Sequence, residues 1–352
     1  MSEYNSDLLI MKKLLILLSL GITTFITRPG YSQQEAQYSQ YMFNPLVINP
    51  AYAGSREAVS AIALFRNQWI GIDGAPITHT LSVHTPYVKR KASLREKKIS
   101  LENKKIGLAY HHIIDQIGPT RRSQFYFGGA YRIAVGSGKL SFGLRGGLEN
   151  YKIEWGEITY QEQNDNVFIE GRKNDKRLIA KIDFGLYYYD KNFYLGGAIV
   201  NLNRPKLGFD YKDPGGDSTR FEEARLSQHF FVSTGYAYPI NEYLVFRPSL
   251  MFKYVANAPL DIDMNVSFLI NNLVWLGTSY RLGHGLNLMM EIVITDQIPP
   301  LSGVRMGYAY DITMQGLKNS RENKIRNSGT HEIFIGYDFE IFRTKVKCPR
   351  FF

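Results

Sequence analysis

Apolar and polar residues alternate along most of the chain after residue 57. From Gln124 to Val135, the odd positions are mostly aromatic or β-branched, and the even positions are mostly polar or small. The same period of two recurs in 77–84, 140–149 and 261–270. One wholly apolar face at this period predicts β-strands with that face in an apolar medium. The pattern gives about fourteen strands, beginning near residues 58, 77, 105, 122, 139, 177, 192, 227, 243, 260, 273, 286, 303 and 331.

The connections between these strands differ in length at the two ends. If the first strand runs outward, the longest polar connections, 152–176, 202–226 and 312–330, all lie on the outer side. The other side has tight turns with fitting residues, namely Gly136-Ser137-Gly138, Asp190-Lys191, Pro239-Ile240-Asn241 and Asn271-Asn272. Long loops outside, short turns inside and an even strand number are typical of a transmembrane β-barrel. The long basic connection from Pro86 to Ser100, on the short-turn side, is an exception.

We therefore predict an all-β fold, an up-and-down antiparallel barrel in a membrane. Strands of about nine to twelve residues suit tilted crossings of the hydrocarbon layer, and closure removes exposed sheet edges. A soluble β-sandwich or a solenoid is the alternative. Tyrosines near strand ends would form interfacial girdles or core aromatics: Tyr187, Tyr188, Tyr189, Tyr236, Tyr238, Tyr308 and Tyr310.

Composition favours many short strands. Aromatic residues make up 14% of the chain, with 24 Tyr and 21 Phe, and hydrophobic residues only 44%. These values exclude a helical membrane bundle. The formal net charge of +10 suits a surface that faces anionic lipid or an acidic partner as well as it suits nucleic acid.

The N-terminus has the pattern of an export signal. Lys12-Lys13 precede an apolar run from Leu14 to Phe25, which is too short to span a bilayer, and Gly30 and Ser32 suit cleavage before Gln33. A buried core helix is the alternative. Export argues against a nucleic-acid partner. The predicted divisions are a signal peptide (1–32), an extended N-terminal segment (33–57), the barrel (58–342) and a tail (343–352).

Two further features concern the ends of the chain. Met11, with its two following lysines, is the expected start, and Met1 to Ile10 an extension. The only cysteine, Cys348, lies in the tail, so no lipid-accepting cysteine follows the signal and internal disulfides are excluded.

If the apolar face meets lipid, the opposite face lines the interior. That face carries charges of both signs: Arg132, Arg145, Lys181, Arg247, Lys253 and Arg305 against Glu149, Asp183, Asp261, Asp263, Glu291, Glu332 and Asp338. Near balance suits an interior cross-linked by ion pairs, whereas a selective ion channel more often has a ring of one sign. A barrel of this size is too wide to be filled by its own side chains, so something else is expected to occupy it.

Catalytic and metal-binding patterns are weak. His111 and His112 are adjacent and point to opposite faces of a strand, and the other histidines are scattered. The glycines of 143–147 lack the strand-then-helix context of a phosphate loop. Asp261 and Asp263 alternate with apolar residues, which favours lining of the interior over acid–base work. We predict no enzyme, no cofactor and no metal.

Two Asn-Pro pairs mark the segment before the first strand. The blocks from Gln40 to Pro45 and from Asn49 to Gly54, followed by Phe65 to Trp69 and Gly74 to Thr78, closely resemble the PorP/SprF family. The resemblance continues to the C-terminus. The family motif residues are Gln40, Tyr41, Phe43, Asn44, Pro45, Asn49, Pro50, Tyr52, Gly54, Arg66, Gln68 and Trp69.

This resemblance implies an outer-membrane protein of a Gram-negative bacterium, a non-enzymatic barrel of the type IX secretion and gliding-motility machinery. Its implied partners are outer-membrane lipid, other type IX components, and a secreted cargo or adhesin with a C-terminal sorting domain. A porin or small-solute channel is the alternative that the barrel alone would favour. An outer-membrane hydrolase would need a catalytic constellation that the sequence does not show.

The segment around Tyr41 to Tyr52 is the nearest candidate for the occupant of the lumen. We predict that Tyr41, Phe43, Pro45, Asn49, Pro50 and Tyr52 pack against barrel residues as an internal plug or gate. If these side chains were exposed instead, the segment would be a docking tail for a periplasmic partner.

Overall fold

The computed structural model describes residues 38–56, 58–87, 105–154, 175–207, 225–282, 285–294, 302–313 and 328–340. The predicted signal peptide and C-terminal tail lie outside these residues. Within them, no helix is long and apolar enough to cross a membrane.

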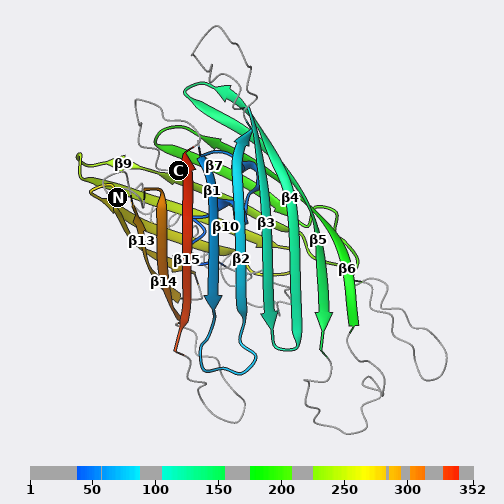
Figure 1. The fold of residues 1–352 in the computed structure, drawn as a ribbon. Coiled ribbons are helices and arrows are strands. Elements are labelled where there is room, and N and C mark those ends of the chain that lie inside the picture. The colour runs from blue at the N-terminus through cyan, green and yellow to red at the C-terminus, as the bar shows by residue number, and fades with distance from the viewer. Residues whose placement is uncertain are drawn as a thin grey trace, which may run out of the picture.

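The described strands form one antiparallel sheet that closes on itself (Figure 1). They are β1 (Ala58–Asn67), β2 (Ile77–Tyr87), β3 (Ile106–Ile117), β4 (Thr120–Val135), β5 (Gly138–Ile153), β6 (Asp175–Tyr189), β7 (Phe193–Val200), β8 (His229–Tyr236), β9 (Tyr238–Pro239), β10 (Leu244–Val255), β11 (Asp261–Ile270), β12 (Val274–Arg281), β13 (Gly285–Val293), β14 (Val304–Thr313) and β15 (Thr330–Glu340).

Closure comes from the pairing of the first strand with the last. β1 pairs with β15 along its whole length, from Ala58 opposite Glu340 to Asn67 opposite His331. β8 and β9 both pair with β10 and are separated only by Ala237, so they form one crossing. The described chain is thus a barrel of fourteen crossings, and the predicted fold class and strand order are confirmed.

Alternation of the side chains gives the barrel an apolar outside and a polar inside. On β5, Arg145 and Glu149 are buried, whereas Phe142, Leu144 and Leu148 are 40%, 57% and 50% exposed on the other face. A soluble sandwich would bury the apolar face and expose the polar one. The observed arrangement is that of a barrel in lipid.

Connection lengths identify the two ends of the barrel. Gly136 and Ser137 alone link β4 to β5, and Asn271 and Asn272 adopt the left-handed conformation between β11 and β12. The two longest connections, after β5 and β7, and the connection after β14 lie at the opposite end, which is the lower end in Figure 1. Because outer-membrane barrels carry long loops outside, that end is the outer one, and β1 begins at the inner end. The connection from β2 to β3, 88–105, is the long exception at the end with the tight turns.

Three strands are longer than the sequence pattern predicts. β4 and β5 have 16 residues each and β6 has 15. The β4–β5 ladder continues from Thr120 opposite Ile153 to Val135 opposite Gly138, so the hairpin stays hydrogen-bonded to its tip. Strand length here is set by this pairing rather than by the thickness of the hydrocarbon layer.

Pairing between β6 and β7 is incomplete. β7 pairs only with Phe184 to Tyr189, the inner part of β6. Farther out, the Asn203 side chain takes the place of a strand, donating to the Ala180 carbonyl at 2.8 Å and accepting from the Ile182 amide at 3.1 Å.

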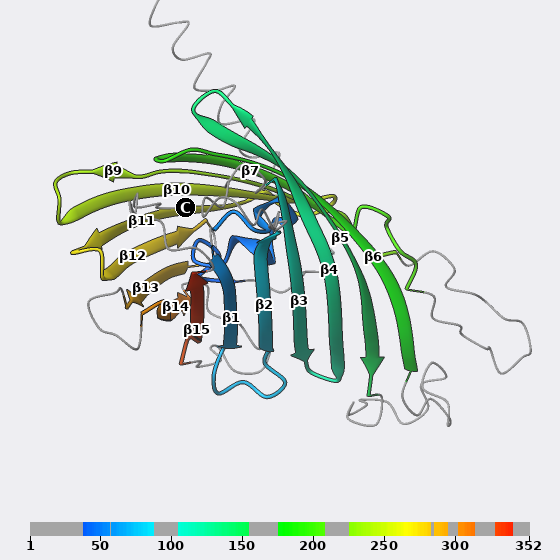
Figure 2. The same ribbon diagram turned by 45° about the horizontal axis from the view of Figure 1, so that its top comes forward.

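Residues 38–56, which we call the leader, lie inside the barrel (Figure 2). The leader is ordered, but two 3-10 turns, η1 (Pro45–Val47) and η2 (Pro50–Tyr52), make it more compact than an extended segment. Asn44 and Asn49 stay non-helical before each proline, and proline then begins the turn, as its fixed φ allows. The main hydrophobic cores form between the leader and the inner wall.

Candidate functional site

The outer part of the leader is held by one buried carboxylate. Glu332 accepts the backbone amides of Ser39 and Gln40 at 3.0 and 2.8 Å. Arg66 contacts the same carboxylate at 2.9 Å and Asp311 at 3.0 Å. Arg66 and Glu332 are 1% and 0% exposed. Backbone amides of the leader and charged side chains of the wall therefore share a single polar network at this level.

Aromatic side chains of the leader fill the next level. The Tyr41 hydroxyl hydrogen-bonds with Asn265, and burial raises the pKa of this phenol well above its ordinary value, so it stays neutral. Arg305 donates to the Phe43 carbonyl at 3.1 Å, and the Arg247 guanidinium lies 5.5 Å from the Phe43 ring. The wall thus binds both the backbone and the rings of the leader.

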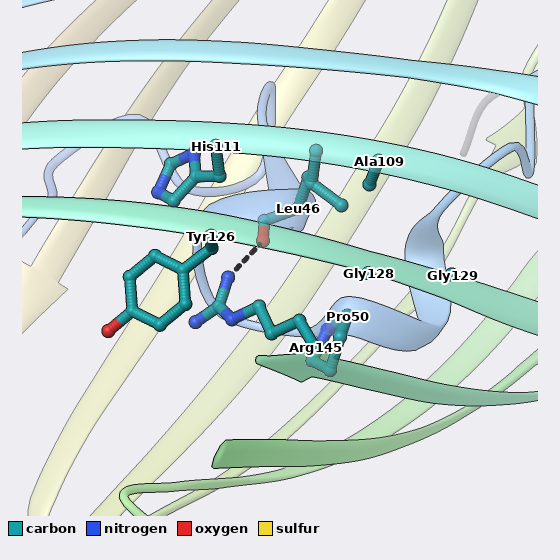
Figure 3. Close-up of a pocket in the computed structure, with 8 residues that line it drawn as sticks. All are labelled: Leu46, Pro50, Ala109, His111, Tyr126, Gly128, Gly129 and Arg145. Carbon is teal, nitrogen blue, oxygen red and sulfur yellow. Dashed lines mark hydrogen bonds between the residues drawn. The ribbon is translucent and has the colours of Figure 1, made fainter. Parts of the chain in front are cut away.

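Arg145 fixes the first 3-10 turn. Its guanidinium donates to the Leu46 carbonyl at 3.0 Å (Figure 3). It also donates to the Val47 carbonyl at 3.3 Å, and its Nε contacts Asp183 at 2.6 Å. The same guanidinium lies 4.7 Å from the centre of the Tyr126 ring. A cation held this way by a carboxylate and a ring is positioned to bind the carbonyl end of a turn.

The second 3-10 turn approaches the wall so closely that only glycine fits. A Cβ on Gly143 would lie 2.1 Å from the Ala51 nitrogen, and one on Gly185 would lie 2.0 Å from the Asn49 Oδ1. Ser141 beside them donates to the Ala51 carbonyl at 2.6 Å. Small residues on the inner face of β5 and β6 therefore provide the room for the leader.

The leader leaves the lumen at the inner end of the barrel. Arg56 forms an ion pair with Asp338 at 2.5 Å, and Arg132 donates to the Ala53 carbonyl at 2.9 Å. Gly54 has a φ of +66°, which turns the chain toward the start of β1. Both ends of the leader are thus tied to β15, by Glu332 and by Asp338.

The structure places the motif residues in two groups. Ten line or occupy the interior: Gln40, Tyr41, Phe43, Asn44, Pro45, Asn49, Pro50, Tyr52, Gly54 and Arg66, of which only Pro45 is half-buried and the others are buried. Gln68 and Trp69 lie apart, in the connection from β1 to β2 at the outer end. There the Trp69 amide donates to Thr330 Oγ1 at 3.3 Å.

The predicted lumen residues lie on the inner face of the wall. Arg132, Arg145, Glu149, Lys181, Asp183, Arg247, Asp263, Glu291 and Arg305 are buried, and Asp261 is half-buried. Many of them pair: Glu149 lies 3.1 Å from Lys181, and Asp263 lies 2.7 Å from Lys253 and 2.8 Å from Arg281. The carboxylate of Asp263 is thus held by two cations.

Tyr187 and Tyr189 are core aromatics rather than girdle residues, which is the second of the two predictions made for them, because they point inward. Sequence reasoning missed their contact with the leader, where the Tyr187 ring meets the Tyr52 ring edge-on at 5.5 Å. Tyr236 and Tyr238 do face outward. Among the described residues, no group of three or more His, Cys, Asp or Glu side chains could hold a metal ion. The signal for the missed contacts was the run of small residues on inner positions of β5.

Comparison with known proteins decides the family. Residues 30–337 match the sequence profile described as "Type IX secretion system membrane protein PorP/SprF". The chain belongs to the PorP/SprF family. It is therefore an outer-membrane barrel of type IX secretion in a Gram-negative bacterium, and this family and fold are of a non-enzymatic kind. No curated protein matches the PorP/SprF chain described here.

Solved structures resemble this PorP/SprF barrel only distantly. The toluene transporter TodX of Pseudomonas putida has a TM-score of 0.48 at 9% identity, covering 89% of this chain and 96% of its own. The toluene transporter TbuX of Ralstonia pickettii has a TM-score of 0.47 at 8% identity, covering 85% and 92%. The outer membrane protein Omp33 of Acinetobacter baumannii has a TM-score of 0.41 at 9% identity, covering 80% and 99%. Similarity this low does not indicate that the present chain transports a solute.

Proposed function

We propose that this barrel serves type IX secretion as a plugged receptor, which helps to secrete or retain cargo with a C-terminal sorting domain at the cell surface. The observation that carries the proposal is the leader, which occupies the lumen from near Glu332 to Asp338. A barrel filled in this way offers its outer face to a partner rather than its interior to a passing chain.

The leader meets the wall around almost the whole circumference. It hydrogen-bonds or packs against strands β1–β7 and β10–β15. On one side Asn49 donates to the carbonyls of Leu186 at 2.8 Å and Gly197 at 3.3 Å. On the other, Asn287 donates to the Ser39 carbonyl at 3.3 Å. A solute that crosses the lumen would have to break bonds on both sides.

The outer end supplies the surface for a partner. The two longest connections, after β5 and β7, leave the barrel there together with the connection after β14, and loops on a rigid scaffold are natural binding surfaces. The connection from β1 to β2 is held firmly between its neighbours, since Ile70 donates to Gly329 at 3.0 Å and Gly118 donates to Gly74 at 2.8 Å. The inner end would face the other components of the machinery.

Deletion of the gene, followed by analysis of the surface proteome, tests the proposed role. We expect loss of one or a few surface proteins that carry a C-terminal sorting domain, and their return on complementation with the wild-type gene. Unchanged export and retention of all such proteins would contradict the proposal.

Conductance separates the proposal from the alternative of a small-solute channel. The purified wild-type barrel in planar bilayers is expected to give no stable conductance steps, because the leader closes the lumen. A variant that lacks residues 38–54 and still folds should give them. Stable steps from the wild-type protein would favour the channel.

A further inference from the structure

Three cations form a row across the outer ends of β4, β5 and β6. Arg121 lies directly opposite Lys152, and Lys152 lies directly opposite Lys176. Residues opposite each other in antiparallel strands have their side chains on the same face, about 5 Å apart. We call these three residues the outer cationic row. The strand ends that carry it are the lower ends of β4, β5 and β6 in Figure 1.

The row faces outward, away from the lumen. Arg122, the neighbour of Arg121, points inward and binds Glu149 at 2.5 Å. Arg121 and Lys176 are exposed and Lys152 is half-buried. Side chains alternate along each strand, so the row must lie on the same face as the apolar belt.

The row lies just beyond that belt. Toward the membrane centre, the next outward positions in the same register are Ser123, Asn150 and Leu178, followed by Phe125, Leu148 and Ala180. Leu178 is 73% exposed and Leu148 is 50% exposed, as expected of residues that contact lipid tails. Charged side chains immediately outside such a belt lie at the level of the lipid headgroups.

The charge of the row is only partly balanced. Lys152 forms an ion pair with Glu154, and Arg121 donates to the neutral Gln116 side chain at 3.0 Å. Among the described residues, one carboxylate thus meets three adjacent cations. Like charges directly opposite each other on neighbouring strands destabilise a sheet, so an anion bound across the row would stabilise the outer ends of β4–β6.

We propose that the outer cationic row binds the phosphate groups of a phosphorylated glycolipid in the outer leaflet of the outer membrane. Guanidinium and ammonium groups are the usual ligands of phosphate, and a spacing of about 5 Å lets two neighbouring side chains hold one phosphate. The outer leaflet places such phosphates at the height of the row. This inference does not depend on the role of the barrel in cargo handling.

The test uses the full-length mature protein, purified in neutral detergent and freed of lipid. Binding of the purified glycolipid, of its dephosphorylated form and of inorganic phosphate is measured by native mass spectrometry. The variant carries Arg121→Gln, Lys152→Gln and Lys176→Gln. The control carries Arg204→Gln, Lys206→Gln and Arg225→Gln, which remove the same charge from exposed positions on the connection after β7.

We expect the variant to bind the phosphorylated glycolipid at least about tenfold more weakly than the wild type, since it loses three charge-assisted bonds. The control should bind it like the wild type, and the dephosphorylated lipid should bind weakly to all three proteins. Heat-dependent gel mobility checks that each barrel is folded. An Arg121→Lys variant, which keeps the charge, should retain binding.

Three results would overturn the proposal. Equal binding by the variant and the wild type would remove the row as the site, and equal binding of the dephosphorylated lipid would remove phosphate as the ligand. Inorganic phosphate that binds as tightly as the lipid would point to a free anion.

Discussion

Glu332 holds both the leader and a buried arginine of the wall. Its carboxylate is 0% exposed, accepts two leader amides and neutralises Arg66. A buried ion pair gains little over a well-packed apolar pair, but removing one partner leaves an unpaired charge in a dry site. The effect of Glu332 on stability is therefore seen mainly as the cost of replacing it, which leaves Arg66 without this partner.

We expect Glu332→Gln to lower the free energy of unfolding by about 3 kcal/mol, because among the described residues Arg66 then keeps only Asp311 as a charged partner. Urea unfolding in lipid vesicles, followed by tryptophan fluorescence, measures the change. Glu242→Gln, an exposed position in the turn before β10, is the matched control and should change stability by less than about 0.5 kcal/mol. Equal effects of the two substitutions would contradict the role of Glu332.

At this scale, the sequence predicted which side chains face inward but not what they touch. Period two places Arg145 and Asp183 on the inner face with no knowledge of the fold. It cannot show that Arg145 binds the Leu46 carbonyl, 99 residues earlier in the chain. Such pairings depend on the path of the leader in three dimensions, which local pattern does not encode.

The leader is the element that lies inside the barrel and packs against its inner wall. An extended segment is predicted here, whereas proline after a non-helical asparagine begins a 3-10 turn in each case. The compact turns bring Ala51 and Asn49 against Gly143 and Gly185. The shape of the leader and the small residues of the wall therefore match each other.

A larger side chain at Gly143 should displace the leader. Gly143→Leu places carbon atoms where the backbone of Ala51 now lies, and overpacking of this kind costs about 1–3 kcal/mol. We expect faster trypsin cleavage after Arg56, at the end of the leader. Gly146→Leu on the same strand is the control, because a Cβ there meets nothing within 4 Å. Leader cleavage at the same rate in both variants would argue against the fit at Gly143.

The alternation of apolar and polar residues predicts the fold of the whole molecule more fully than it predicts the site. Fourteen crossings, their order and the long-loop end could all be predicted, because each crossing has its own apolar stripe. The length of β4–β6 and the incomplete β6–β7 pairing could not. They depend on hydrogen bonds to a neighbouring strand, which the pattern of one strand does not contain.

An arginine in the middle of the apolar belt should impair the fold of the whole barrel. Leu144 is 57% exposed near the centre of β5, so Leu144→Arg should destabilise the inserted barrel by about 2–4 kcal/mol. Folding into lipid vesicles, read by gel mobility, measures the effect. Ser137→Arg, in the turn after β4, lies outside the belt and should fold like the wild type. Normal folding of both variants would contradict the placement of the belt.

The attachment of the leader to β15 sets an order for biogenesis. Gln40 lies 292 residues before Glu332, so the attachment of Ser39 and Gln40 to this carboxylate cannot form until the last strand has arrived. Closure over so long a separation is slow. A barrel that stalls before its final strand therefore lacks this attachment at the outer part of the leader, and we expect quality-control proteases to recognise incomplete molecules by it.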